Sequence, residues 1–367
     1  MKYKLLFVVS NLRRTGPVNQ LLHILSNLDR EKYEAKVLTL SNETIDTRIY
    51  DYKKRGIEVT SLSLSRLKGI FSAKKKIRDY IKSYNPNIIQ SQGIRADNLI
   101  SQLSNNIPWI STARNFPYED YPSKFGLVKG RLMAFNHIKI LKKCTNLVSC
   151  SQSIASKLAS IGVHSQIIRN GVEIDKKKSS ESKNLNKVKL ISVGSLIPRK
   201  NMKYIVNVSN ELNKLGVNFE LTILGDGPQL NELKEISCER IKYIGMVDNV
   251  NDYLASADIF ISSSLSEGLP NTVLEALSCG LPVILSDISS HREIAEQLPL
   301  QYSLLYSLDT NEALFANDLN SYIPSLLNIK NEVISKDTDL KFSAKAMSYH
   351  YQDLYEKILK CQKAIIQ

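Results

Sequence analysis

The feature that most constrains the fold is a regular alternation between short β-branched runs and segments with helical periodicity. In the first half of the chain, six strand-like runs read LLFVV, AKVLTL, IEVTSL, NIIQSQ, PWISTA and NLVSCS. Helical patterns lie between or after these runs, at residues 18–28, 47–55, 72–83, 96–104 and 152–161. Strands that alternate with helices of about ten residues are typical of a parallel α/β sheet.

The same alternation resumes in the second half, after a polar stretch without periodicity at Asp175–Lys189 that we interpret as a linker. The strand-like runs here are KLISVG, FELTILG, IKYIG, DIFISSS and PVILS. Helical patterns follow them at 202–215, 229–238, 250–255, 271–279 and 291–297. Because 367 residues are too many for one ordinary core, we expect two doubly wound, Rossmann-like α/β domains at 1–175 and 187–341. A helix at 342–367 is amphipathic, and we expect it to pack back toward the first domain.

The beginning of the chain, MKYKLLFVVSNL, has an apolar run that is too short for the hydrophobic region of a signal peptide. We therefore expect Leu5–Val9 to be a buried strand. No run approaches the roughly 18–20 apolar residues of a membrane-spanning helix. The five cysteines are scattered and form no CxxC pair, which indicates a reducing cytoplasm and predicts neither a disulfide framework nor a zinc site.

Charge is distributed unevenly along the chain. Residues 1–184 contain 32 Lys and Arg against 14 Asp and Glu, a net +18, whereas residues 185–367 contain 17 against 22, a net −5. A basic half favours an anionic partner, either nucleic acid or a membrane surface. Because basic motifs interleaved with aromatic residues are absent, we expect an anionic membrane and no nucleic acid. The cations that we expect to face it are KKKIR (Lys74–Arg78), Lys139, Lys142 and Lys143.

The segment SEGLPNTVLEALSCGLPVI, at 266–284, carries two carboxylates in an otherwise apolar stretch. Glu267 lies just beyond the carboxyl end of a predicted strand, where doubly wound sheets bind ligands. Pro270 suits the start of the next helix, whose first backbone N–H groups form an anion site. Glu275 follows one helical turn after Asn271 and would accept hydrogen bonds from sugar hydroxyls. Carboxylates on both sides of a phosphate site suggest a nucleotide-sugar, although Glu275 could also serve only the helix dipole.

Two further turns follow strands of the same half. SVGSLIPRKN contains adjacent cations, Arg199 and Lys200, which could offset the charge of a diphosphate. Such a pair is more often a solvated surface pair. LGDGP, at 224–228, is a tight turn after a strand, and because it lacks the GxGxxG fingerprint we do not expect NAD.

Taken together and in this order, these pieces resemble the retaining glycosyltransferases of family 4, which have the two-domain GT-B fold. The matching segments are IIRNGVEID, VGSLIPRKN, LTILGDGP, YIGMVDNV and SEGLPNTVLEALSCGLPVI, the last with an E-x7-E signature at Glu267 and Glu275. The resemblance covers essentially the whole chain. It implies two Rossmann-like domains that face a central cleft, and no bound metal or other cofactor.

The resemblance also implies roles for individual residues. Arg199 and Lys200 would hold the donor diphosphate, Glu267 would contact the donor sugar, and Glu275 the ribose hydroxyls. The remaining donor-binding positions that it implies are Gly16, Gly194, Met246, Val247, Gly268, Leu269, Pro270, Asn271 and Thr272.

The resemblance implies that the domain at 1–175 binds the acceptor and the domain at 187–341 binds the nucleotide-sugar. The first domain departs from the family pattern. The loop SNLRRTGPVNQ has the single Gly16 where family members usually have paired glycines. Arg114 and Asn115 stand where many members have a histidine, and Gln90 and Gln92 replace an HxH pattern.

Arg114 could stabilise the departing diphosphate, or it could pair structurally with Glu119 or Asp120. None of the five histidines offers an obvious general base. We expect His291 to be a loop residue.

The sequence thus predicts a retaining, metal-independent hexosyltransferase with a nucleotide-sugar donor, most simply a UDP-sugar, and the catalytic residues Glu267, Arg199, Lys200 and Arg114. The leaving phosphate itself would take the acceptor proton. We expect a lipid-linked acceptor in bacterial surface polysaccharide synthesis (O-antigen, capsule or exopolysaccharide), at the inner face of the plasma membrane. Two alternatives remain open, a UDP-sugar epimerase of the same fold and a catalytically degenerate partner subunit that only binds a sugar nucleotide or another transferase.

Overall fold

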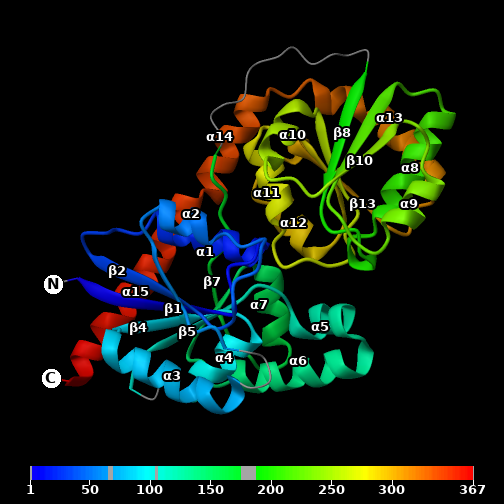
Figure 1. Ribbon diagram of the computed structural model, residues 1–367. Helices are drawn as coiled ribbons and strands as arrows, with labels where there is room; N and C mark the ends of the chain where they lie inside the picture. The colour runs from blue at the N-terminus through cyan, green and yellow to red at the C-terminus, as the bar shows by residue number, and fades with distance from the viewer. Residues whose placement is uncertain (1, 65–68, 104–105, 175–186, 367) are drawn as a thin grey trace. The chain divides into compact units, whose positions relative to one another are not determined.

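The computed structural model describes residues 2–64, 69–103, 106–174 and 187–366. The chain forms two compact units (Figure 1). The first comprises Met1–Gly171 together with Ala344–Gln367, and the second comprises Val172–Ser343. Each unit is built around one parallel sheet, which confirms the prediction of two doubly wound α/β domains.

The sheet of the first unit has the order β3-β2-β1-β4-β5-β6-β7. Its strands are β1 (Tyr3–Val9), β2 (Tyr33–Thr39), β3 (Glu58–Ser61), β4 (Ile88–Ser91), β5 (Trp109–Ala113), β6 (Asn146–Ser149) and β7 (Gln166–Ile167). Its helices are α1 (Gly16–Ser26), α2 (Ile49–Lys54), α3 (Gly69–Tyr84), α4 (Ile94–Ile100), α5 (Pro117–Phe125), α6 (Leu127–Leu141), α7 (Gln152–Ala159) and α15 (Ala344–Ile366). The strand order reverses between β1 and β4, and such a switch point is where open α/β sheets bind ligands.

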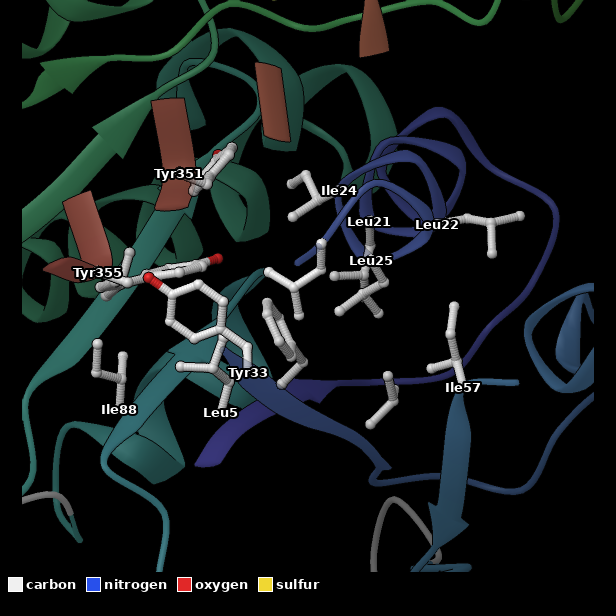
Figure 2. Close-up of a cluster of buried hydrophobic side chains, with 14 of the residues drawn as sticks. Leu5, Leu21, Leu22, Ile24, Leu25, Tyr33, Ile57, Ile88, Tyr351 and Tyr355 are labelled. Atoms are coloured by element: carbon white, nitrogen blue, oxygen red, sulfur yellow. The ribbon is translucent and has the colours of Figure 1, made fainter. Parts of the chain in front are cut away.

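The C-terminal helix α15 packs within the first unit. Figure 2 shows Tyr351 and Tyr355 of this helix among buried side chains of α1 and of the strands. Tyr355 meets the ring of Tyr33 edge to face, with the ring centroids 5.9 Å apart, and donates a hydrogen bond of 2.6 Å to Oε1 of Gln90. Gln90 therefore serves to anchor α15 to β4.

The sheet of the second unit has the order β10-β9-β8-β11-β12-β13, which repeats the pattern of the first. Its strands are β8 (Val188–Val193), β9 (Phe219–Leu224), β10 (Ile241–Gly245), β11 (Ile259–Ser262), β12 (Val283–Ser286) and β13 (Ser303–Tyr306). Its α-helices are α8 (Met202–Lys214), α9 (Leu230–Ile236), α10 (Val250–Ser256), α11 (Asn271–Ser278), α12 (Ser289–Ala295), α13 (Glu312–Leu327) and α14 (Asn331–Phe342). The switch point lies between β8 and β11.

Several elements were missed by the sequence analysis, namely α5, α6, β7, β13, α13 and α14. Most of the expected linker, residues 175–186, lies outside the described residues, and its last two residues, Val188 and Lys189, belong to β8. The terminal helix begins at Ala344, because Phe342 ends α14. No helix in the described part of the chain is both long and apolar enough to span a bilayer.

Candidate functional site

The loops that follow β8 and β9 in the second unit are held together through their backbones. The Gly194 N–H donates to the Leu224 carbonyl at 2.9 Å, and the Gly225 N–H donates to the Gly245 carbonyl at 2.8 Å. Gly225 has φ +134°, and a Cβ there would lie 1.9 Å from the Gly194 carbonyl oxygen. Only glycine allows this approach, so the LGDGP turn fixes the position of the loop that carries Arg199 and Lys200.

Three charged side chains meet where β8 and β11 end. Arg199 and Lys200 form the 3₁₀ turn Pro198–Lys200 after β8, and Glu267 lies in the loop after β11. Arg199 Nη1 lies 2.9 Å from Glu267 Oε2, and Lys200 Nζ lies 2.5 Å from Glu267 Oε1. The Ser264 hydroxyl donates a further bond of 2.9 Å to Glu267 Oε1. The two cations are therefore not a solvated surface pair.

This cluster of Arg199, Lys200 and Glu267 carries a net charge of +1, since two cations share one carboxylate. The side chains are 17%, 14% and 8% exposed, respectively. Burial alone would raise the pKa of Glu267, but the charges of Lys200 and Arg199 and their hydrogen bonds outweigh it and hold the pKa at about 2. The cluster thus stays charged at neutral pH and retains an excess positive charge that suits an anionic ligand.

The first turn of α11 follows Glu267 directly. Pro270 is its N-cap, one position earlier than the first turn expected from the sequence. The preceding residues Gly268 and Leu269 are buried, whereas Asn271 and Thr272 at the helix start are half-buried. Backbone N–H groups in a first turn have no acceptor within the helix, so this turn can bind an anion.

Two other expected donor-binding positions lie on the same unit. Glu275 is half-buried on α11, one turn after its start. Met246 is exposed and Val247 half-buried directly after β10, the edge strand of the parallel sheet. All these loops follow the carboxyl ends of parallel strands, which lie at one edge of the sheet.

His291 is not a loop residue, and this prediction was wrong. It lies within α12 and is fully buried. Its Nδ1 lies 2.8 Å from the Ser286 carbonyl oxygen, and its Nε2 is buried without a hydrogen-bond partner among the described residues. Burial lowers the pKa of His291 to about 4, so the ring is neutral at physiological pH. No signal of this burial is present in the sequence, because the apolar periodicity of the short β12–α12 segment is weak.

The first unit contains a cavity of about 310 Å³ where β1, β4 and β5 end. Its polar lining includes Gln92, Arg95, Arg114, Asn115, Asp120, Tyr121, Lys124 and His137. Its apolar lining includes Val9, Ile94, Phe125, Met133 and Leu141. Thr15 and Pro17, on either side of Gly16 at the start of α1, also line it. His137 lines this cavity, and the sequence suggested no role for it.

Arg114 follows β5 and lines this cavity. Its Nη1 donates a hydrogen bond of 2.5 Å to Asn170 Oδ1, while its Nε and Nη2 are buried without partners among the described residues. Glu119 pairs with Lys157 and Asp120 pairs with Lys124 instead. The structural pair that we considered for Arg114 is therefore wrong, and two nitrogen atoms of its guanidinium are left without an acceptor among the described residues.

Comparison with known protein families matches both units. A model of "Glycosyltransferase Family 4" matches residues 14–176, and a model of "Glycosyl transferases group 1" matches residues 187–321. The chain is 22% identical to the Escherichia coli "O-antigen biosynthesis glycosyltransferase WclY" over 97% of its own length and 99% of the relative's length. It is 27% identical to an E. coli "UDP-Gal:alpha-D-GlcNAc-diphosphoundecaprenol alpha-1,3-galactosyltransferase", over 46% of each chain.

Among solved structures, HepE from Anabaena in complex with UDP-glucose superimposes with a TM-score of 0.78. This match covers 96% of the present chain and 99% of HepE, with 16% identity. At that identity the similarity establishes the fold, and it is the two-domain fold expected from the sequence.

Proposed function

Because the chain belongs to the family 4 glycosyltransferases and has the GT-B fold, we propose that it transfers a hexosyl group from a UDP-sugar to a lipid-linked acceptor. We further propose that the transfer retains the anomeric configuration and serves bacterial surface polysaccharide synthesis (O-antigen, capsule or exopolysaccharide). The names of the two E. coli relatives support the polysaccharide and the lipid-linked acceptor, and the HepE complex supports the UDP-sugar. The observation that carries the proposal is the net positive cluster of Arg199, Lys200 and Glu267 beside the start of α11.

The cluster suits the donor in a specific way. Arg199 and Lys200 would bind the diphosphate together with the first-turn N–H groups of α11, and Glu267 would accept a hydrogen bond from a sugar hydroxyl. Glu275 would accept hydrogen bonds from the ribose hydroxyls, and the backbone at Met246–Val247 would contact the base.

The same groups account for catalysis. As the acceptor hydroxyl oxygen attacks the anomeric carbon, the bond from that carbon to the diphosphate oxygen breaks, and the acceptor proton passes to a phosphate oxygen. Negative charge accumulates on the diphosphate, where fixed cations and helix N–H groups stabilise the transition state more than the ground state. Arg199 and Lys200 would supply this charge without a metal ion, and we keep Arg114 as a candidate for the same role because two of its nitrogen atoms have no acceptor among the described residues.

UDP should raise the melting temperature of the purified protein, and GDP and ADP should not. A ligand at about 100 times its Kd stabilises the native state by roughly 2.7 kcal/mol, which a thermal-shift assay detects. Glu275→Ala should lose this stabilisation, because the ribose hydroxyls lose their acceptor. Glu296→Ala, which removes an exposed carboxylate from the C-cap of α12 in the same unit, is the matched control and should keep it. If no nucleotide shifts the melting temperature, the chain is better described as a degenerate partner subunit that binds another transferase.

We also propose that the first unit docks on the anionic inner face of the plasma membrane, as a cytoplasmic enzyme would to reach a lipid-linked acceptor. Lys74, Lys75, Lys76 and Arg78 are exposed on α3, and Lys139, Lys142 and Lys143 are exposed at the end of α6. Helix α6 also exposes large apolar side chains among its cations, at Leu127, Val128, Leu132 and Phe135. In Figure 1 both helices lie at the lower edge of this unit. Cations beside exposed apolar side chains are typical of helices that lie in a membrane interface.

The protein should sediment with vesicles that contain phosphatidylglycerol at low salt, and much less at 0.5 M salt. Replacing Lys74, Lys75 and Lys76 with glutamine should weaken binding about 100-fold, since each cation near the surface contributes about 1 kcal/mol. Leu132→Ser with Phe135→Ser should also weaken it. The matched control is Leu314→Ser with Leu340→Ser, which removes exposed apolar side chains from the second unit. Equal sedimentation of all four proteins would contradict the proposed docking.

A further inference from the structure

The cavity in the first unit has the size and the mixed lining of a site for one sugar ring. Its volume of about 310 Å³ is at the lower end of small-molecule sites. Apolar side chains such as Phe125, Met133 and Leu141 can cover a ring face, whereas polar groups can meet its hydroxyls. Two of the polar lining residues, Tyr121 and His137, form the end of a buried hydrogen-bond chain that reaches the cavity.

The direction of this chain is fixed at its inner end by Trp109. The indole Nε1–H can only donate, and it donates to Ser91 Oγ at 2.7 Å. The Ser91 hydroxyl then donates its own proton to Asp97 Oδ1, at 2.6 Å. All three residues are buried, so water does not offer alternative partners.

The direction continues from Asp97 to the cavity wall. The other carboxylate oxygen, Oδ2, lies 2.8 Å from His137 Nε2, and a carboxylate only accepts, so Nε2 carries the proton. A ring that carries only this proton presents Nδ1 as an acceptor, and Nδ1 lies 2.7 Å from the Tyr121 hydroxyl oxygen. In that state the Tyr121 proton is directed at His137, and the phenol oxygen can only accept from a further partner.

Packing holds the Tyr121 ring in this orientation. Tyr121 stacks on His137, with the ring planes 18° apart and the centroids separated by 5.8 Å. Helices α5 and α6 meet at Gly130, where a Cβ would lie 2.4 Å from the Pro122 backbone nitrogen. Such close packing leaves the phenol little freedom to turn away from His137.

We propose that the Tyr121 oxygen is the hydrogen-bond acceptor for one hydroxyl of the acceptor sugar, held in that polarity by the buried chain Trp109, Ser91, Asp97 and His137. This inference rests on the proposed function and adds to it a binding residue and the direction of the hydrogen bond that this residue makes. Tyr121 is then a specificity-determining residue. An acceptor that carries hydrogen or an ether oxygen in place of the recognised hydroxyl cannot donate to the Tyr121 oxygen and leaves its lone pair without a hydrogen bond. Asp97 and His137 act through it as positioning residues.

The first test is Tyr121→Phe, assayed with UDP-sugars and the octyl glycosides of glucose, galactose, N-acetylglucosamine and N-acetylgalactosamine as acceptors. Loss of one hydrogen bond between neutral groups should raise the KM for the best acceptor about tenfold and leave kcat within about twofold. The monodeoxy analogue that lacks the recognised hydroxyl should be about tenfold poorer for the wild-type protein and no poorer for Tyr121→Phe. Tyr84→Phe, which removes another hydrogen-bonded phenol of the same unit, is the control and should match the wild type.

The second test needs no acceptor. Nitrogen-15 NMR of the imidazole should show His137 protonated at Nε2 and bare at Nδ1. In Asp97→Asn, the amide oxygen can keep the bond from Ser91 while its N–H₂ group donates to Nε2. The tautomer should therefore switch to Nδ1–H, and the Tyr121 hydroxyl should become a donor toward the cavity. Asp97→Asn should therefore no longer prefer the acceptor over the monodeoxy analogue that lacks the recognised hydroxyl.

These tests separate the inference from the proposed function. If UDP raises the melting temperature but Tyr121→Phe leaves the acceptor KM unchanged, the inference is overturned and the proposed function stands. A wild-type His137 protonated at Nδ1 overturns the inference equally, as does failure of all four glycosides to bind the UDP-bound wild-type protein at millimolar concentration. Failure of UDP itself to bind contradicts the proposed function and leaves the NMR result to decide the hydrogen-bond direction.

Discussion

Glu267→Gln should lower the rate of sugar transfer at least about 100-fold. It should also destabilise the second unit and strengthen the binding of UDP. The loss of rate follows because a buried carboxylate that, in the function we propose, would meet the donor sugar is replaced by a neutral amide. The loss of stability follows because Arg199 and Lys200 keep their burial and lose their counter-charge. Removing one partner from a buried ion cluster typically costs about 3–5 kcal/mol.

The size of this stability effect can be checked against the titration of Glu267. Its pKa lies at about 2, against an ordinary value of 4.5, and this difference corresponds to about 3 kcal/mol at neutral pH. Urea unfolding of wild type and Glu267→Gln at pH 7.5 would measure it. Equal unfolding free energies would show that the cluster does not form in solution.

The gain in UDP affinity is the most specific part of this prediction. The cluster changes from a net +1 to a net +2, and UDP lacks the sugar that Glu267 would contact, so only the repulsion between the carboxylate and the phosphates is removed. UDP should therefore raise the melting temperature of Glu267→Gln by more than that of the wild type. Glu275→Gln is the matched control, and it should weaken UDP binding. If both variants behave alike, the two glutamates do not have the separate roles that we propose.

The sheets could be predicted from the sequence because their central strands are buried on both faces. Runs such as LLFVV and DIFISSS are then continuous and β-branched, and the helices between them have one apolar face. Helices α5 and α6 could not be predicted in this way. Pro122, Gly126 and Gly130 interrupt the pattern, and the apolar residues of α6 are distributed around the helix, with Leu132 and Phe135 exposed.

The candidate site, like the fold, could be predicted from the sequence only in part. The order of motifs predicted which second-unit residues would lie in loops after strands, because in parallel sheets this follows from the chain order alone. It did not predict that Arg199 and Lys200 would share Glu267 as a partner, since such contacts depend on loop conformation. The hydrogen-bond chain from Asp97 through His137 to Tyr121 joins residues up to 40 positions apart on three helices, two of them unrecognised, and no local pattern marks it.

A histidine that is buried and neutral should make the second unit sensitive to mild acid, and replacing it should remove that sensitivity. His291 is fully buried, and burial lowers its pKa from 6.5 to about 4. Between these two values the unfolded chain binds a proton at this position and the folded chain does not. The stabilisation is therefore complete above pH 6.5 and is lost as the pH falls toward 4, with a slope of about 1.4 kcal/mol per pH unit.

The variant that isolates this effect is His291→Asn, whose amide N–H can replace Nδ1–H as a donor to the Ser286 carbonyl and does not titrate. It should be less stable than wild type at pH 7.5, because the smaller side chain leaves a cavity. Between pH 7.5 and 4.5, however, wild type should lose about 2–3 kcal/mol of unfolding free energy more than the variant loses. Glu267 does not contribute to this window, because its depressed pKa makes its stabilisation fall only below pH 4.5. Urea unfolding at half-unit pH intervals would resolve the two windows, and parallel curves for the two proteins would mean that the folded protein protonates His291 as readily as the unfolded chain does.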